Sequence, residues 1–247
     1  MGSVSKLFGE YGSWGTKIQE GLSYLPDCNL ALVMRAWEKG GLLAPSWKDG
    51  QPFRLWLNVI GHNIAVARLA WRLAGRLEGK LADVTAIQIL EAALVHDAFK
   101  RREWEQTQEA KRSEEWAEKN RQAELANIGF LRNCGFEQAV ISLACATGDV
   151  GLEAVRLGTT SLGQKIVFYA DNCVSGDKIV GYRKRFDDLL PEFEPGGRYQ
   201  HVDAAYLVRY GQTHRQIWDA VNIPLQEKLA QLIGFSEPGN LFRLAFD

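Results

Sequence analysis

The chain has 247 residues, of which 46% are hydrophobic and 24% are charged, and its formal net charge is −1. These values suit a globular chain with a buried core, and the near-neutral charge gives no long-range field for nucleic acid or an anionic membrane. No stretch is apolar over 18 residues, and no basic segment precedes an apolar core at the N-terminus. We therefore expect neither a membrane span nor a secretory signal.

The cysteine pattern favours reduced thiols. Cys28, Cys134, Cys145 and Cys173 are widely separated, and no Cys-x-x-Cys pair occurs. This spacing argues against a disulfide framework and against a thiolate zinc site. We expect mostly buried thiols in a cytoplasmic protein.

The first quarter of the chain gives one clear helix. Residues 1–25 are rich in glycine and aromatic residues and predict no particular element. Residues 27–38 predict a short helix with Asp27 or Asn29 as its cap, and a loop rich in glycine and proline follows.

Two strongly periodic segments predict long helices in the middle of the chain. Apolar residues recur at steps of three and four over residues 53–78 and again over residues 85–104, where Thr85 is a plausible N-cap. Residues 100–126 carry many charges of both signs, which favours a solvated helix face over a nucleic-acid surface.

Further along, helices and loops alternate. Residues 137–147 predict an apolar helix, residues 148–158 a loop-like stretch, and residues 191–199 a loop rich in proline and glycine. A last helix is predicted over residues 213–233, with Pro224 kinking or splitting it.

Local propensity is divided over residues 162–190. Residues 166–169 are β-branched and aromatic, which favours a strand. The spacing of Ile166, Ala170 and Val174 favours a helix instead. The residues alone leave both alternatives open here.

Histidines are few, and two of them lie in apolar helical segments. The four are His62, His96, His201 and His214, and His96 is followed by Asp97 in EAALVHDAFKR. A buried imidazole beside a buried carboxylate is costly unless both have partners, and a metal ion satisfies both at once. The alternative is a satisfied core histidine beside an aspartate at a helix end. The last two histidines are expected to be surface or structural residues.

Three predicted helices can bring the polar residues to one point. His62 lies on the core-facing stripe of its helix, and Asp171 lies on the core-facing part of a later one, in YADNCVSGDKIV. Ala92 and Ala93 come one turn before the His-Asp pair and allow a neighbouring helix to approach closely.

These segments resemble the HD superfamily of metal-dependent phosphohydrolases. The matching pieces are the histidine in GHNIAVARLAWRLA, the His-Asp pair in LEAALVHDAFK and the aspartate in IVFYADNCVSGDKIV, and they cover roughly residues 55–190. The resemblance implies an all-α helical bundle, which makes residues 163–175 helical. It also implies an N-terminal extension (1–50), an HD core (51–190) and a C-terminal helical extension packed on the core (191–247).

The resemblance further implies that His62, His96, Asp97 and Asp171 bind one divalent metal ion. Mixed imidazole and carboxylate ligands suit manganese, iron, cobalt, nickel, zinc or magnesium. Such an ion would activate water for attack on phosphorus and neutralise charge on the phosphoryl oxygens. Asp97 would act as a catalytic residue by orienting that water.

Candidate substrate-binding residues flank these ligands. Lys100 completes a His-Asp-x-x-Lys pattern that resembles a branch of the family in which the lysine helps to bind phosphate, although Phe99 replaces the usual glycine. The alternative role of Lys100 is to complement the dipole at a helix C-terminus. Lys178, two turns after the last aspartate, and Arg54, two turns before the first histidine, are further candidates, as is Asp149.

A second metal is not expected. Two-metal members of the family carry extra histidines between the His-Asp pair and the last aspartate. This chain has Ala123 and either Ala146 or Thr147 at the corresponding positions.

The leading hypothesis is an enzyme that hydrolyses a phosphate ester of a nucleotide or similar small molecule by metal-activated water. One alternative is a non-catalytic HD module that binds a nucleotide or phosphate, and another is a structural metal site. The expected partner is a small-molecule phosphate ester, not a membrane or nucleic acid. The two terminal extensions show no motif and are open to a role in capping the pocket or in a homodimer.

Overall fold

Helices dominate the described part of the chain. The computed structural model describes residues 12–44, 46–48, 51–53, 56–107, 116–197 and 199–246. Within these residues the fold is all-α, which confirms the predicted class, and its strands form two short antiparallel hairpins.

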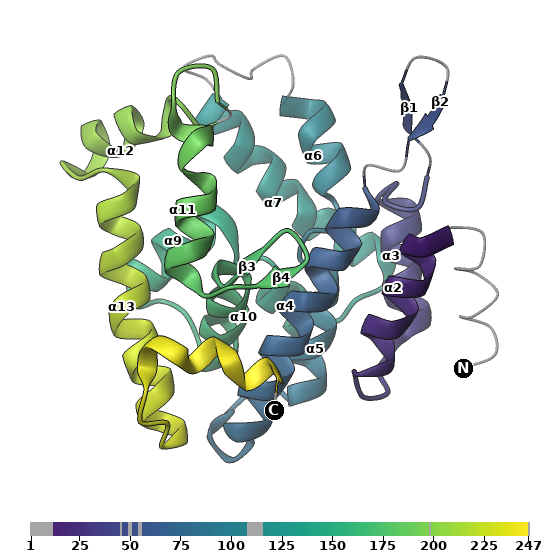
Figure 1. Ribbon diagram of the computed structural model, residues 1–247, viewed down its shortest axis with the longest axis horizontal. Coiled ribbons are helices and arrows are strands. Elements are labelled where there is room, and N and C mark those ends of the chain that lie inside the picture. The colour runs from purple at the N-terminus through teal and green to yellow at the C-terminus, as the bar shows by residue number, and fades with distance from the viewer. Residues whose placement is uncertain are drawn as a thin grey trace.

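The elements follow one another closely along the chain (Figure 1). The first hairpin pairs β1 with β2 and the second pairs β3 with β4. The bounds are α2 (Gly12–Ser23), α3 (Leu30–Lys39), β1 (Ser46–Lys48), β2 (Gln51–Phe53), α4 (Leu57–Arg76), η2 (Glu78–Lys80), α5 (Ala86–Val95), α6 (Lys100–Thr107), α7 (Trp116–Cys134), α8 (Gln138–Ala144), α9 (Gly148–Arg156), α10 (Leu162–Asn172), β3 (Val174–Ser175), β4 (Lys178–Ile179), α11 (Tyr182–Phe193), α12 (Val202–Tyr210), α13 (His214–Ile233) and η3 (Pro238–Phe246).

The core is built around α4, which packs against α5 and α10. Figure 1 shows α2 and α3 on one side of this centre and α13 on the other, and η3 contacts both α13 and α4. Buried apolar side chains from Ile18 to Ala245 form one continuous cluster. The N-terminal and C-terminal segments therefore share a core with the central helices.

Several helix starts follow directly from the sequence. The Asn29 side chain caps α3, as predicted, by accepting a hydrogen bond from the Leu32 N–H at 3.2 Å. Thr85, Ser161 and Thr213 each form a capping box with the glutamine three residues later, at the starts of α5, α10 and α13. Each box satisfies backbone N–H groups that lack helical partners.

The second long helix predicted from the sequence is wrong: it is two helices, α5 and α6, joined by a turn. Side chains supply the hydrogen-bond donors at this break. The Leu94 carbonyl accepts from Trp37 Nε1 at 2.8 Å and from Asn63 Nδ2 at 3.1 Å, and the His96 carbonyl accepts from Asn127 Nδ2 at 2.9 Å. Because these donors satisfy the terminal carbonyls, the helix ends without leaving them unpaired.

The helix predicted over residues 163–175 ends earlier than expected. Its first part is helical, as α10, but a hairpin follows before α11 begins. The Cys173 carbonyl accepts from the N–H groups of Val180 and Gly181, at 2.8 and 3.1 Å, which closes the hairpin. Gly176 and Gly181 have φ values of +59° and +85°, a conformation that glycine adopts without strain.

The loop-like stretch predicted over residues 148–158 is helical as α9, and the loop predicted over residues 191–199 begins later because α11 continues through Pro191. Among the described residues, no single helix has the length and apolar composition to cross a membrane. In the described part of the chain, one pair of helices, α8 and α9, meets that criterion when taken together, across a bend of 92°.

The backbone of Gly40 lies close to the turn between α5 and α6, so a substitution at Gly40 tests how that turn is packed. A Cβ atom at this residue would lie 1.9 Å from the Ala98 carbonyl oxygen, so we expect Gly40→Ala to destabilise the fold by about 1–3 kcal/mol. The control is Gly75→Ala, because Gly75 is exposed on α4 and a Cβ there would meet nothing within 4 Å. That change should stabilise by about 0.5–1 kcal/mol. Thermal unfolding by circular dichroism measures both, and equal melting temperatures would contradict this packing.

Candidate metal centre

The packing of α4, α5 and α10 brings the predicted ligands together. His62 lies on α4, His96 and Asp97 follow the last residue of α5, and Asp171 is near the end of α10. One ligand atom from each of His62, His96 and Asp97 lies within 4.8 Å of the others. Asp171 Oδ1 is 2.9 Å from His62 Nε2 and 3.5 Å from His96 Nε2.

Backbone carbonyls fix the orientation of both imidazole rings. His62 Nδ1 is 3.0 Å from the Gly176 carbonyl oxygen, and His96 Nδ1 is 2.8 Å from the Ala93 carbonyl oxygen. A carbonyl only accepts hydrogen bonds, so each Nδ1 carries the proton that it donates. In the neutral rings each Nε2 therefore presents a lone pair to the acidic side chains, an arrangement typical of metal-binding histidines.

The donor set fits a cation. His96 Nε2 is buried and has no hydrogen-bond partner among the described residues. Lone pairs on two imidazoles and on neighbouring carboxylates repel one another unless a proton or a metal ion lies between them. His62, His96 and Asp97 thus form a group that can hold a metal ion, and Asp171 lies against both rings.

Without a metal, the same groups form a network of ions. Burial lowers the pKa of His96, but the charges of Asp97 and Asp171 outweigh it and raise that pKa to about 9. Burial raises the pKa of Asp171, but contacts with His62 and His96 hold it well below its usual range. Asp97 also has a lowered pKa, because Lys100 and His96 outweigh its burial.

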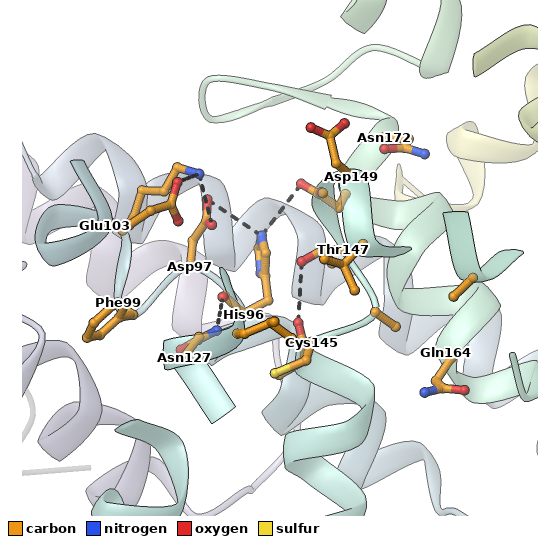
Figure 2. Close-up of a pocket in the computed structure, with 18 of the residues that line it drawn as sticks. His96, Asp97, Phe99, Glu103, Asn127, Cys145, Thr147, Asp149, Gln164 and Asn172 are labelled. Atoms are coloured by element: carbon orange, nitrogen blue, oxygen red, sulfur yellow. Dashed lines mark hydrogen bonds and ion pairs between the residues drawn. The ribbon is translucent and has the colours of Figure 1, made fainter. Parts of the chain in front are cut away.

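Lys100 adds a positive charge beside this cluster. Its Nζ lies 2.8 Å from Glu103 Oε1 and 3.8 Å from Asp97 Oδ1. Burial lowers the pKa of Lys100, but the carboxylates of Glu103 and Asp97 outweigh it and hold the pKa well above the ordinary value. In Figure 2, Asp97 lies between His96 and Glu103. Phe99, next to these residues, packs against Phe130 with ring centroids 5.2 Å apart.

The four predicted ligands and Lys100 line one cavity of about 460 Å³. This volume lies in the range of small-molecule sites. Its wall also includes Asp149, a candidate from the sequence, and two residues that the sequence did not single out for this site, Arg185 and His214. The basic run YRKRFDD contains Arg185, but the sequence gives no signal for which of its cations faces the cavity.

Other candidates are placed differently. Lys178 lies on β4, so the expectation that it follows Asp171 by two helical turns is wrong. It lines a second cavity together with Lys17 and Arg68 and is not among the residues that line the first. Arg54 lies outside the described residues.

Two residues at predicted second-metal positions and one late histidine also border the first cavity. Ala146 and Thr147 line it. His214, expected to be a surface or structural residue, is 6% exposed and lines it too, whereas His201 is not among the lining residues.

Comparison with known protein families, with curated proteins and with solved structures finds no match for this chain. The functional assignment therefore depends on the geometry of the site itself.

Removing one imidazole should abolish tight metal binding. We expect His62→Ala to weaken the affinity for manganese or cobalt by more than about a hundredfold. Loss of a residue that only orients a metal ligand typically lowers metal affinity by about 10–100-fold, and loss of a direct ligand should cost more. His201→Ala is the matched control, because His201 is not among the cavity-lining residues. Isothermal titration calorimetry measures both affinities. Equal affinities would show that the metal binds elsewhere.

Metal binding should weaken as the pH falls. The raised pKa of His96, about 9, means that its ring is protonated at neutral pH when no metal is bound. A metal must displace this proton, so the apparent dissociation constant should rise by about tenfold for each pH unit below 9 while one proton is released. Titrations between pH 6.5 and 8.5, in two buffers of different ionisation enthalpy, test the slope and count the protons. A dissociation constant that does not change with pH would exclude His96 as a ligand.

Proposed function

We propose that the chain is a metal-dependent phosphohydrolase of the HD type, which cleaves a phosphate ester of a nucleotide or a similar small molecule by metal-activated water. One observation carries the proposal. His62 and His96 are held by backbone carbonyls so that both Nε2 atoms face acidic side chains, inside a cavity that also contains Lys100.

The metal would be held by His62, His96, Asp97 and Asp171. The mixed nitrogen and oxygen donors suit manganese, iron, cobalt, nickel, zinc or magnesium. When bound, one such ion would supply an activated water and positive charge for the phosphoryl oxygens.

Lys100 would bind the phosphoryl group. Its ammonium group is ionised throughout the neutral range and is held in place by Glu103 and Asp97. A cation that is already positioned stabilises negative charge without reorganising during the reaction. Asp97 has a lowered pKa and stays ionised, so it would orient the attacking water by accepting a hydrogen bond.

Arg185 would supply a second positive charge. Gly181, at the start of α11, donates its N–H to the Cys173 carbonyl, which places the start of α11 beside the end of α10. Arg185 is in the first turn of α11 and lines the cavity. Because a guanidinium presents paired N–H donors, Arg185 could donate two hydrogen bonds to a phosphate group.

Phosphate release tests the proposal. A panel of nucleotides and simple phosphate esters is incubated with the protein and manganese, cobalt or magnesium. We expect metal-dependent release, and we expect Asp97→Asn to reduce kcat/KM by more than about a hundredfold, because the variant loses a charged metal ligand that also orients the water.

The control is Asp83→Asn, which changes an exposed aspartate outside the cavity and should keep the activity. Metal content is measured on each protein. If the native protein binds metal and releases phosphate from none of the compounds, the site is a binding module and the hydrolase proposal is wrong.

A further inference from the structure

The four candidate metal ligands form only part of the cavity wall. Another part is formed by α9 and α13 and by the segment before α10, and it holds Asp149, Thr160, His214 and Trp218. We call these four residues the polar wall. In the view of Figure 2, Asp97 and Glu103 lie to the left of the pocket and Thr147 and Asp149 to the right.

Asp149 presents a carboxylate oxygen to this cavity. Its Oδ1 accepts a hydrogen bond from the Tyr206 hydroxyl at 3.1 Å and lies 3.4 Å from His214 Nε2. Both interactions use Oδ1, no hydrogen bond or ion pair to Oδ2 is found among the described residues, and the side chain is 37% exposed. Asp149 is thus held by one oxygen and keeps the other as an acceptor for a ligand.

Three other atoms of the polar wall lack partners. His214 Nδ1, Trp218 Nε1 and Thr160 Oγ1 are buried and make no hydrogen bond to any described residue. Most buried polar atoms in proteins are hydrogen-bonded, and all three residues line the same cavity, so a polar ligand or ordered water is a candidate for the missing partner.

Packing holds His214 rigidly in this wall. Its ring stacks against Phe186 and Phe193, with centroids 5.8 and 5.3 Å away, and meets the edge of Tyr206 at 4.8 Å. The Asp203 carboxylate accepts a hydrogen bond from the His214 backbone N–H at 2.8 Å. A ring fixed by these contacts also fixes the position of Asp149, which suits a site that selects its ligand by hydrogen bonding.

The chemistry of these atoms selects one kind of ligand group. The Trp218 indole N–H can only donate, the Asp149 carboxylate can only accept, and the Thr160 hydroxyl does both. A phosphate only accepts and is repelled by Asp149, whereas an ammonium group only donates and cannot pair with the indole. Hydroxyl groups both donate and accept, so they match all three.

We propose that the polar wall is a subsite for the uncharged, hydroxyl-bearing part of a phosphate monoester, such as a sugar. The position of the phosphate rests on the proposed function, since the metal ligands, Lys100 and Arg185 would bind it. The substrate class is then a monophosphate with hydroxyl groups near the ester, and not a compound with a second phosphate at the far end.

Matched ligands test the subsite by binding alone. Ribose 5-phosphonate and pentylphosphonate both have a C–P bond that hydrolysis does not cleave, and they differ in that the first carries a sugar ring with hydroxyl groups and the second an apolar chain. We expect the metal-loaded native protein to bind the sugar phosphonate at least about tenfold more tightly than pentylphosphonate. The pentyl chain would leave the polar groups of the protein without hydrogen-bond partners, which weakens its binding. Isothermal titration calorimetry measures both dissociation constants.

Variants then assign this preference to Asp149. Asp149→Leu should bring the ratio of the two constants close to one, whereas Asp149→Asn keeps an acceptor oxygen and should keep most of the preference. Glu153→Gln is the control, because Glu153 is on the same helix, pairs with Arg209 and is not among the lining residues. Circular dichroism confirms that each variant is folded, and the comparison of Asp149→Asn with the native protein remains informative if Asp149→Leu does not fold.

Phosphate release from ribose 5-phosphate, measured in parallel, separates this inference from the proposed function. Equal binding of the two phosphonates by the native protein, or an unchanged preference in Asp149→Leu, would overturn the subsite even if phosphate is released. A preference that depends on Asp149, with no phosphate release from ribose 5-phosphate or from any compound of the panel, would support the subsite and overturn the hydrolase.

Discussion

The candidate site depends on how α5 ends. Trp37, Asn63 and Asn127 come from three other helices and donate hydrogen bonds to the carbonyls of Leu94 and His96. A helix that ends inside a core leaves carbonyls without partners, and these donors satisfy them. The chain can therefore turn within the core, and this turn lets two consecutive side chains, an imidazole and a carboxylate, border the same cavity.

The end of α10 and the hairpin after it complete the site around His62. Asp171, near the end of α10, contacts Nε2 of His62, and Gly176, in the hairpin that follows, accepts from Nδ1 of the same ring. One short stretch of chain thus fixes both the orientation and the electrostatic environment of His62. The hairpin also returns the chain to start α11 beside α10, which brings Arg185 to the cavity. Metal ligation and substrate contact would thereby depend on the same local turn.

The sequence was sufficient where local patterns decide the structure. Apolar periodicity predicted α4, and the caps Asn29 and Thr85 marked the starts of α3 and α5. The convergence of two histidines and two aspartates was also predicted from core-facing stripes. What it missed depends on contacts between distant segments. The break after α5 requires donors from three other helices, and the buried place of His214 depends on packing by α11 and α12. No local pattern carries that information.

A crystal structure of the protein soaked in manganese would test the metal centre, with anomalous diffraction recorded at a wavelength where manganese scatters strongly. We expect one peak in the cavity, within bonding distance of the Nε2 atoms of His62 and His96 and of carboxylate oxygens from Asp97 and Asp171. We also expect both Nδ1 atoms to keep their backbone carbonyl partners. A peak elsewhere, or none in the cavity with His62 still bound to Asp171, would contradict the metal centre and the function built on it.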